Sequence, residues 1–266
     1  MDIASILGLV LALILMVYGI IAGQELSIII GFLDFNSALI TFGGALAVLL
    51  AMSPSIGAYI NNFKSFSLVL KTMPSNEKET IEDIIRLSNV ARKEGLLALE
   101  EAANTIEDDF MKKGVLLIVD GTDPELVRSI METELSCIED RHKSVIEFWE
   151  NLGAMGPAWG MIGTLIGLIN MLGKLSDVAS VGPQMAIALI TTFYGSLLAN
   201  WICAPVANKL KSNNSTEVKL KEVMVEGLLS IQAGENPRVI EEKLKSFLSP
   251  LKRNELGGAE GGEVNG

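Results

Sequence analysis

The chain has 266 residues, of which 49% are hydrophobic and 20% are charged, with a formal net charge of −11. This negative charge argues against a nucleic-acid partner, and a mean hydropathy of +0.41 beside so many charges indicates apolar membrane spans joined to a water-exposed part. Two cysteines, one histidine (His142) and no phosphate-binding glycine motif give no basis for a disulfide framework, a metal site, a cofactor or an enzyme.

The first 55 residues contain two apolar stretches. Ile3–Ala22 carries no charge and has about the 20 residues that a helix needs to cross a bilayer. No basic segment precedes it and no small-residue cleavage motif follows, so we expect a retained span rather than a signal peptide. A second span is predicted over Asn36–Met52, ended by Pro54. Residues 1–55 are therefore expected to form transmembrane helices 1 and 2.

Residues 56–151 are rich in charged residues and are predicted to form a helical cytoplasmic domain. Apolar residues recur at spacings of three and four from Ile81 to Ala102, including Leu97, and predict amphipathic helices. Thr80 and Asp83 form a candidate capping box, and Gly95 predicts a turn between two helices. From Asp123, a predicted N-cap, no breaker occurs before Gly153, which predicts one long helix running into the third span.

Residues 152–207 contain the third and fourth predicted spans, Leu152–Leu172 and Pro183–Val206. Residues 208–254 are expected to form two more amphipathic cytoplasmic helices, separated at residues 234–237. The glycine-rich residues 255–266 are expected to be a disordered tail. The predicted fold class is all-α: a polytopic membrane protein with four transmembrane helices and a helical cytoplasmic domain.

The distribution of lysine and arginine predicts the topology. None of the 21 precedes Lys64, eleven lie from Lys64 to Lys143, and nine lie from Lys209 onward. Because positive charges stay on the cytoplasmic side, we expect the insert and both termini to be cytoplasmic.

The four predicted spans contain no Asp, Glu, Lys, Arg or His, although a proton channel normally needs a titrating group within the membrane. They contain hydroxyl groups instead, and Pro157 and Pro205 lie near two span ends. A stripe of small residues follows one face of the third span: Gly156, Gly160, Gly163 and Gly167. Such a stripe packs either against a span of the same chain or against a foreign helix, and spacing alone leaves both open.

Four sequence segments together resemble the MotA family (PomA in sodium-driven relatives), the stator subunit of the bacterial flagellar motor. They are "GGALAVLLAMSP", "RKEGLLALEE", "GPAWGMIGTLIGLINML" and "ALITTFYGSLLANWICAPVANKL". The resemblance implies a ring of five subunits in the inner membrane around two copies of a MotB-like, peptidoglycan-anchored partner. That partner supplies the missing membrane Asp, and ion flow past it turns the ring against the rotor protein FliG, with lipid as the surrounding partner.

The resemblance also assigns roles to individual residues by position. Charged residues that meet the rotor are implied at Arg92, Lys93, Glu100 and Glu101. An ion path is implied at Thr164, Thr191 and Thr192, coupling hinges are implied at Pro157 and Pro205, and the glycine stripe becomes a candidate for packing against the partner helix.

Two alternative functions and the identity of the coupling ion remain open. An ExbB/TolQ-like ion-driven energiser has a similar architecture but usually three spans, and a small solute transporter would need internal repeats that this chain lacks. The coupling ion is either H⁺ or Na⁺: the threonine oxygens slightly favour Na⁺, yet a membrane threonine commonly bonds its own helix carbonyl.

Overall fold

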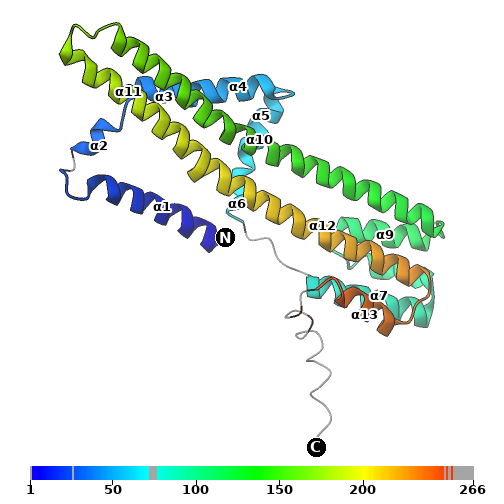
Figure 1. The fold of residues 1–266 in the computed structure, drawn as a ribbon. Helices are drawn as coiled ribbons and strands as arrows, with labels where there is room; N and C mark the ends of the chain where they lie inside the picture. Colours follow the sequence, from blue (N-terminus) through cyan, green and yellow to red (C-terminus); the bar gives the residue numbers. More distant parts are fainter. Residues whose placement is uncertain (1, 26, 72–76, 249, 251–252, 254–266) are drawn as a thin grey trace, which may run out of the picture. The chain divides into compact units, whose positions relative to one another are not determined.

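Helices form all the regular structure in the part of the chain that the structure, a computed structural model, describes: residues 2–25, 27–71, 77–248, 250 and 253 (Figure 1). The predicted all-α fold class is confirmed. The helices are α1 (Ile3–Ile21), α2 (Ile28–Gly31), α3 (Phe35–Ala38), α4 (Gly44–Met52), α5 (Ile56–Lys64), α6 (Phe66–Val69), α7 (Glu77–Glu94), α8 (Leu99–Ala103), α9 (Asp109–Val119), α10 (Pro124–Leu172), α11 (Val178–Leu197), α12 (Ala204–Gln232) and α13 (Pro237–Lys245). Short π-helical segments, η1 (Leu39–Gly43) and η3 (Leu198–Cys203), join α3 to α4 and α11 to α12, and a 3₁₀ turn, η2 (Leu96–Ala98), precedes α8.

Four helical stretches in the described part are long and apolar enough to cross a membrane. They are Ile3–Ile21, Phe35–Met52, Pro124–Leu172 and Val178–Gln232. The chain is thus a multi-pass membrane protein, as the sequence predicts.

The predicted long helix through the third span is confirmed as α10. A carboxylate oxygen of Asp123 accepts the backbone N–H of Glu125 at 3.0 Å, which satisfies an otherwise unpaired donor at the start of this helix. The turn predicted at Gly95 is also confirmed: Gly95 has φ +87°, a conformation that side chains with a Cβ rarely adopt, and it ends α7.

Three local predictions are wrong. The capping box does not exist, because α7 begins at Glu77 and leaves Thr80 buried inside the helix. The helix that contains the fourth span begins before Pro183, at Val178, because the Asp177 carboxylate accepts the N–H of Ala179 and caps the helix there. The first helix predicted after residue 208 is no separate element, since α12 continues without a break from Ala204 to Gln232.

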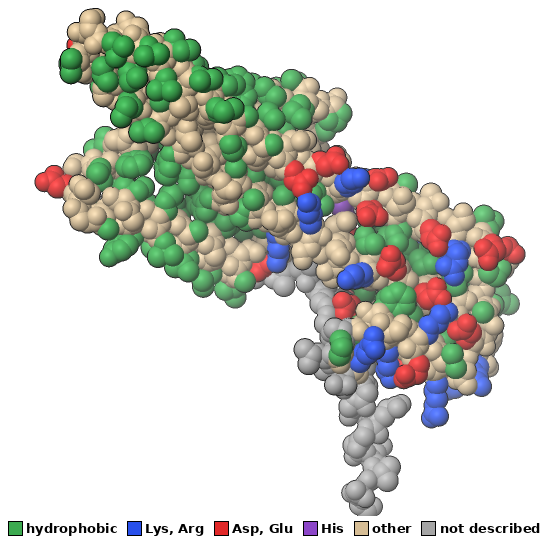
Figure 2. Space-filling view, in the orientation of Figure 1, with side chains coloured by type: hydrophobic (Ala, Val, Ile, Leu, Met, Phe, Trp, Pro, Cys, Tyr) green, Lys and Arg blue, Asp and Glu red, His purple; other side chains and the backbone are tan. Residues whose placement is uncertain are grey.

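The chain divides into two compact units. The first unit comprises residues 1–72 and 142–212, and the second comprises residues 73–141 and 213–266. Figure 2 shows hydrophobic side chains spread over the helices of the first unit, whereas Lys, Arg, Asp and Glu gather on the helices of the second. This contrast is the one expected between lipid-exposed and water-exposed surfaces.

The core of the first unit contains an aromatic cluster. Phe63 packs edge-on against Phe148 at 4.9 Å between ring centroids, and Trp149 lies beside both rings. The indole N–H of Trp149 donates to the buried Ser65 hydroxyl at 2.9 Å. Helices α5 and α6 therefore pack with the membrane-spanning helices in the first unit.

The core of the second unit is built from α7, α8, α9, α13 and the parts of α10 and α12 that belong to this unit. Its fully buried side chains include Ile81, Ile84, Leu87 and Leu99, which lie on the apolar face predicted from spacing, together with Val115, Leu228, Ile240 and Leu244. Leu97, which the spacing also places on an apolar face, is 76% exposed instead. The 3₁₀ turn after Gly95 rotates Leu97 away from the core.

Candidate functional site

The four glycines of the third span lie against α11 of the same chain. A Cβ added at Gly160 would lie 2.8 Å from the backbone oxygen of Thr191, and one at Gly156 would lie 2.8 Å from that of Gly195. Gly163 and Gly167 similarly have no room for a side chain beside α11. The space left by the stripe is therefore filled by an intrachain helix, which is one of the two alternatives left open by the sequence.

The close approach of α10 and α11 brings two predicted ion-path residues together. The hydroxyls of Thr164 and Thr192 lie 2.7 Å apart, and the Thr164 hydroxyl also donates to the backbone oxygen of Gly160 at 2.9 Å. Thr192 is exposed and Thr164 is half-buried. The pair therefore presents hydroxyl oxygens on an open side of the first unit, in two predicted spans that contain no Asp, Glu, Lys, Arg or His.

Thr191, the preceding residue of α11, does not join this pair, because its side chain lies against Gly163 of α10. It is fully buried, and its hydroxyl donates to its own helix at the Ala188 backbone oxygen, at 2.9 Å. The hydroxyl of Thr41, which is also fully buried, donates to the backbone oxygen of Thr191 at 3.3 Å. The structure thus separates the three predicted threonines into an exposed pair and a buried packing residue.

Tyr194 forms hydrogen bonds to the connection that precedes the second span, a role that was not predicted from the sequence. Its hydroxyl donates to the backbone oxygen of Phe32 at 2.5 Å and accepts the backbone N–H of Asp34 at 3.1 Å. The Asp34 carboxylate caps α3 by accepting the N–H of Ser37. Because the Tyr194 ring also stacks on Phe42, it fixes the start of the second span against α11.

The two predicted hinge prolines interrupt helices of the first unit in different ways. Pro157 lies within α10, where it has no N–H to donate to the preceding turn. Pro205 follows the π-helical segment η3, whose wider turn accommodates one extra residue before α12 continues. The Trp201 indole N–H, within η3, donates to the backbone oxygen of Leu9 in α1 at 3.0 Å.

Ion pairs of the first unit lie at the ends of the spans. Lys209 pairs with Asp2, and its hydrogen bond lowers the pKa of that carboxyl to about 2. Lys211 of α12 pairs with Glu150 of α10. Charge is thus paired where these helices leave the apolar spans.

The predicted rotor-contact residues all lie exposed in the second unit. Arg92 and Lys93 occupy the last turn of α7, and Glu100 and Glu101 occupy the first turn of α8. Within the described residues, none of these four side chains forms an ion pair. The exposed Leu97 lies in the turn between the two charged pairs, so this surface combines both signs of charge with an apolar side chain.

A partly exposed ion network in the second unit was not predicted from the sequence. Glu226 of α12 pairs with Lys243 of α13 and, at 3.5 Å, with Arg128 of α10. The hydrogen bond from Lys243, with the charge of Arg128, lowers the pKa of Glu226. The three residues are far apart in the sequence, so no spacing pattern signals the network.

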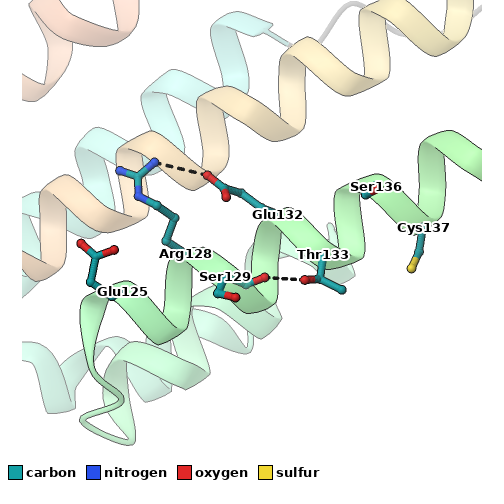
Figure 3. Close-up of a pocket in the computed structure, with 7 residues that line it drawn as sticks. All are labelled: Glu125, Arg128, Ser129, Glu132, Thr133, Ser136 and Cys137. Atoms are coloured by element: carbon teal, nitrogen blue, oxygen red, sulfur yellow. Dashed lines mark hydrogen bonds and ion pairs between the residues drawn. The ribbon is translucent and has the colours of Figure 1, made fainter.

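A shallow hollow on α10 is lined by side chains of that one helix (Figure 3). Arg128 contacts Glu132 at 3.5 Å, and the Thr133 hydroxyl donates to the backbone of Ser129. Cys137, at one end of the hollow, is exposed. Within the described residues no cluster of His, Cys, Asp and Glu has the form of a metal site.

Comparison with known proteins identifies the family. Residues 102–223 match the model of the MotA/TolQ/ExbB proton channel family. The chain is 41% identical to motility protein A of Treponema pallidum (strain Nichols), over 96% of this chain and 97% of that protein. The chain belongs to the MotA/TolQ/ExbB proton channel family. Within it, the chain is 36% identical to chemotaxis protein PomA of Vibrio alginolyticus, over 95% of this chain and 98% of that protein.

A solved structure supports the same family at the level of the fold. The "Structure of C. jejuni MotAB" superposes with a TM-score of 0.84 at 31% identity, covering 94% of this chain and 97% of that chain. The resemblance to MotA and PomA inferred from four sequence segments is therefore confirmed.

Proposed function

We propose that the chain is the ring-forming stator subunit of a bacterial flagellar motor. Its relatives include proteins named motility protein A and PomA, and its fold matches a chain of a MotAB structure. The observation that carries the proposal is chemical: an exposed hydroxyl pair lies on predicted spans that contain no Asp, Glu, Lys, Arg or His. Ion transfer through such spans requires a partner that supplies the carboxylate.

The proposed partner is a MotB-like subunit whose single span carries an Asp. Five copies of this chain would surround two partner spans, in the inner membrane, with both termini of the chain in the cytoplasm. The lysine and arginine distribution supports this orientation. We propose that the ion passes the Thr164–Thr192 hydroxyl pair beside the partner's Asp. The burial of Thr191 supports a packing role for that residue.

The proposed rotor contact is the surface formed by Arg92, Lys93, Leu97, Glu100 and Glu101. Exposed charges of both signs give weak, reversible pairs worth roughly 0–1 kcal/mol each. Weak pairs suit a ring that must grip and release FliG repeatedly, and Leu97 adds an apolar contact between them.

Ion flux with and without the partner tests the proposed function. Proteoliposomes containing the chain alone should show no voltage-driven H⁺ or Na⁺ flux, and co-reconstitution with the MotB-like subunit should produce it. Replacing the partner's membrane Asp by Asn should abolish the flux. Repeating the assay with Na⁺ or H⁺ as the only permeant cation identifies the coupling ion. Flux from the chain alone would refute the requirement for a partner carboxylate.

A further inference from the structure

Along the fourth span, the exposed residues change from apolar to small or polar. Toward the start of α11, the exposed residues are apolar and include the large side chains of Met185 and Leu189, which are 49% and 63% exposed. From the middle of the span onward, the exposed residues recur at every fourth position and are small or polar: Thr192, Ser196, Asn200, Ala204 and Asn208. Polar groups in hydrocarbon are costly, so this half of the open side is unsuited to face lipid.

The π-helical segment keeps these residues near one side. In a regular helix of about 3.6 residues per turn, a repeat of four drifts steadily around the axis. The additional residue accommodated in η3 turns the following residues back by about 100°. Asn208 and Lys211 are thereby returned toward the face that carries Thr192.

A hollow of about 320 Å³ lies on this side, between α10 and the helix formed by η3 and α12. Its polar lining consists of Glu150, Asn200 and Asn208, and Gly153 and Cys203 form part of its floor. The Glu150 carboxylate pairs with Lys211, and both side chains are about half exposed. Glu150 precedes Thr164 by fourteen residues on α10, close to four turns, so both lie on nearly the same face.

We propose that the groove from the Thr164–Thr192 pair to the Glu150–Lys211 pair is the cytoplasmic half of the ion path. This inference rests on the proposed function. A hydrated monovalent cation, Na⁺ or hydronium, leaves the partner's carboxylate, passes Ser196 and Asn200, and exits beside Glu150. The carboxylate attracts the cation to the outlet, and Lys211 offsets enough of its charge to prevent the ion from being held there.

Ion flux through the complete complex with the MotB-like partner tests this outlet. Glu150→Gln should lower the flux several-fold at low ionic strength, and the deficit should shrink as salt screens the field. The matched control is Glu147→Gln, which removes an exposed carboxylate one turn earlier on α10. Equal flux in the two variants, or a deficit of Glu150→Gln that does not respond to salt, overturns the proposal.

A second measurement separates an outlet from a structural pair. Asn208→Cys, in a Cys137→Ser background, places a thiol in the hollow, while the native Cys203 is buried. A positively charged, membrane-impermeant thiol reagent added on the cytoplasmic side should block flux in this variant and leave the Cys137→Ser background unaffected. Unblocked flux after complete labelling overturns the proposal. Absence of flux in the unmodified wild-type complex would instead refute the proposed function itself.

Discussion

The hydroxyl of Tyr194 satisfies two backbone groups in the connection that precedes the second span, Phe32 C=O and Asp34 N–H. Tyr194→Phe removes both hydrogen bonds while it keeps the ring that stacks on Phe42. We expect the protein to lose roughly 1–3 kcal/mol of stability, since partly buried backbone groups lose their partner. The midpoint of thermal unfolding in detergent, followed by tryptophan fluorescence, measures the change.

The control for this prediction is Tyr18→Phe, which removes the hydroxyl of a tyrosine that is 71% exposed on α1. Its midpoint should match that of the wild type. If both variants shift the midpoint equally, the two hydrogen bonds of Tyr194 do not stabilise the fold.

Glu226 gives the second unit a dependence on pH. Its pKa is lowered from 4.5, chiefly by Lys243, so its ion pairs stabilise the folded state fully above about pH 4.5. That stability is lost as the pH falls through the lowered pKa. Glu226→Gln should therefore unfold at a lower temperature than the wild type at neutral pH, and this gap should narrow as the pH falls below about 4.5 and close below the lowered pKa.

Far-ultraviolet circular dichroism across this pH range provides the measurement. The control is Glu222→Gln, an exposed residue on the same helix, which should track the wild type at every pH. A gap for Glu226→Gln that stays constant as the pH falls would show that the variant acts through packing and not through charge.

At the residue scale, the sequence showed which residues carry polar groups but not which partners they contact. The threonines were recognisable as hydroxyls in apolar spans, yet nothing in the spacing distinguishes the buried Thr191 from the exposed Thr192, its neighbour in the chain. The Glu226 network joins three helices. Such choices depend on tertiary packing, which a single helix pattern does not contain.

Among the helices, the contact between α10 and α11 depends on glycine. Gly160→Ala would place a methyl group 2.8 Å from a backbone oxygen of α11, so one helix must move. We expect a loss of roughly 1–3 kcal/mol from overpacking. The shift should also break the Thr164–Thr192 hydrogen bond and reduce ion flux, because both hydroxyls depend on the same close approach. Thermal unfolding and flux with the partner present measure the two effects.

Gly19→Ala is the matched control for this prediction. An added Cβ at Gly19 in α1 meets no other atom within 4 Å, so the variant should gain up to about 1 kcal/mol from helix propensity. Equal midpoints for the two variants would mean that α10 and α11 adjust freely around an added methyl group.

At the element scale, the long helix α10 was predictable because no breaker separates Pro124 from Gly153. The continuation of α12 was not, since the polar run at residues 211–216 has weak intrinsic helix propensity. Extending an existing helix fixes one residue per hydrogen bond, so the nucleation cost that penalises a separate helix does not arise. The π-helical segments have no signature in composition or periodicity.

For the whole molecule, the proposed function requires the exposed charges of the second unit to act outside the chain. Reversing Arg92 and Glu100 together, as Arg92→Glu with Glu100→Arg, should reduce motor torque, because the rotor's matching charges stay unchanged. Membrane insertion, partner binding and ion flux should remain normal, since both side chains are exposed and form no ion pair among the described residues. Tethered-cell rotation and co-purification with the partner measure these properties.

The control reverses Lys78 and Glu82, an exposed pair on the first half of α7. Lys78→Glu with Glu82→Lys keeps the pair and should leave torque unchanged. Unaltered torque in the reversed Arg92 and Glu100 variant would remove this surface from the rotor contact. Loss of that variant from the membrane would show that the two charges support folding.

The last prediction links the ion path to the rotor surface through the two prolines. Pro157 removes a hydrogen bond inside α10, and Pro205 follows the wide turn of η3, so each weakens the helix at one point where bending costs little. Pro157→Ala or Pro205→Ala should preserve insertion and partner binding, and the restored donor should stiffen the helix. If the prolines are hinges, torque per stator should fall although ion binding is intact.

Pro183→Ala, which changes a proline near the beginning of α11, is the control and should leave torque unchanged. Single-motor torque, with the number of stators counted in the same cell, distinguishes these outcomes: normal torque per stator in both hinge variants would leave Pro157 and Pro205 with a structural role only.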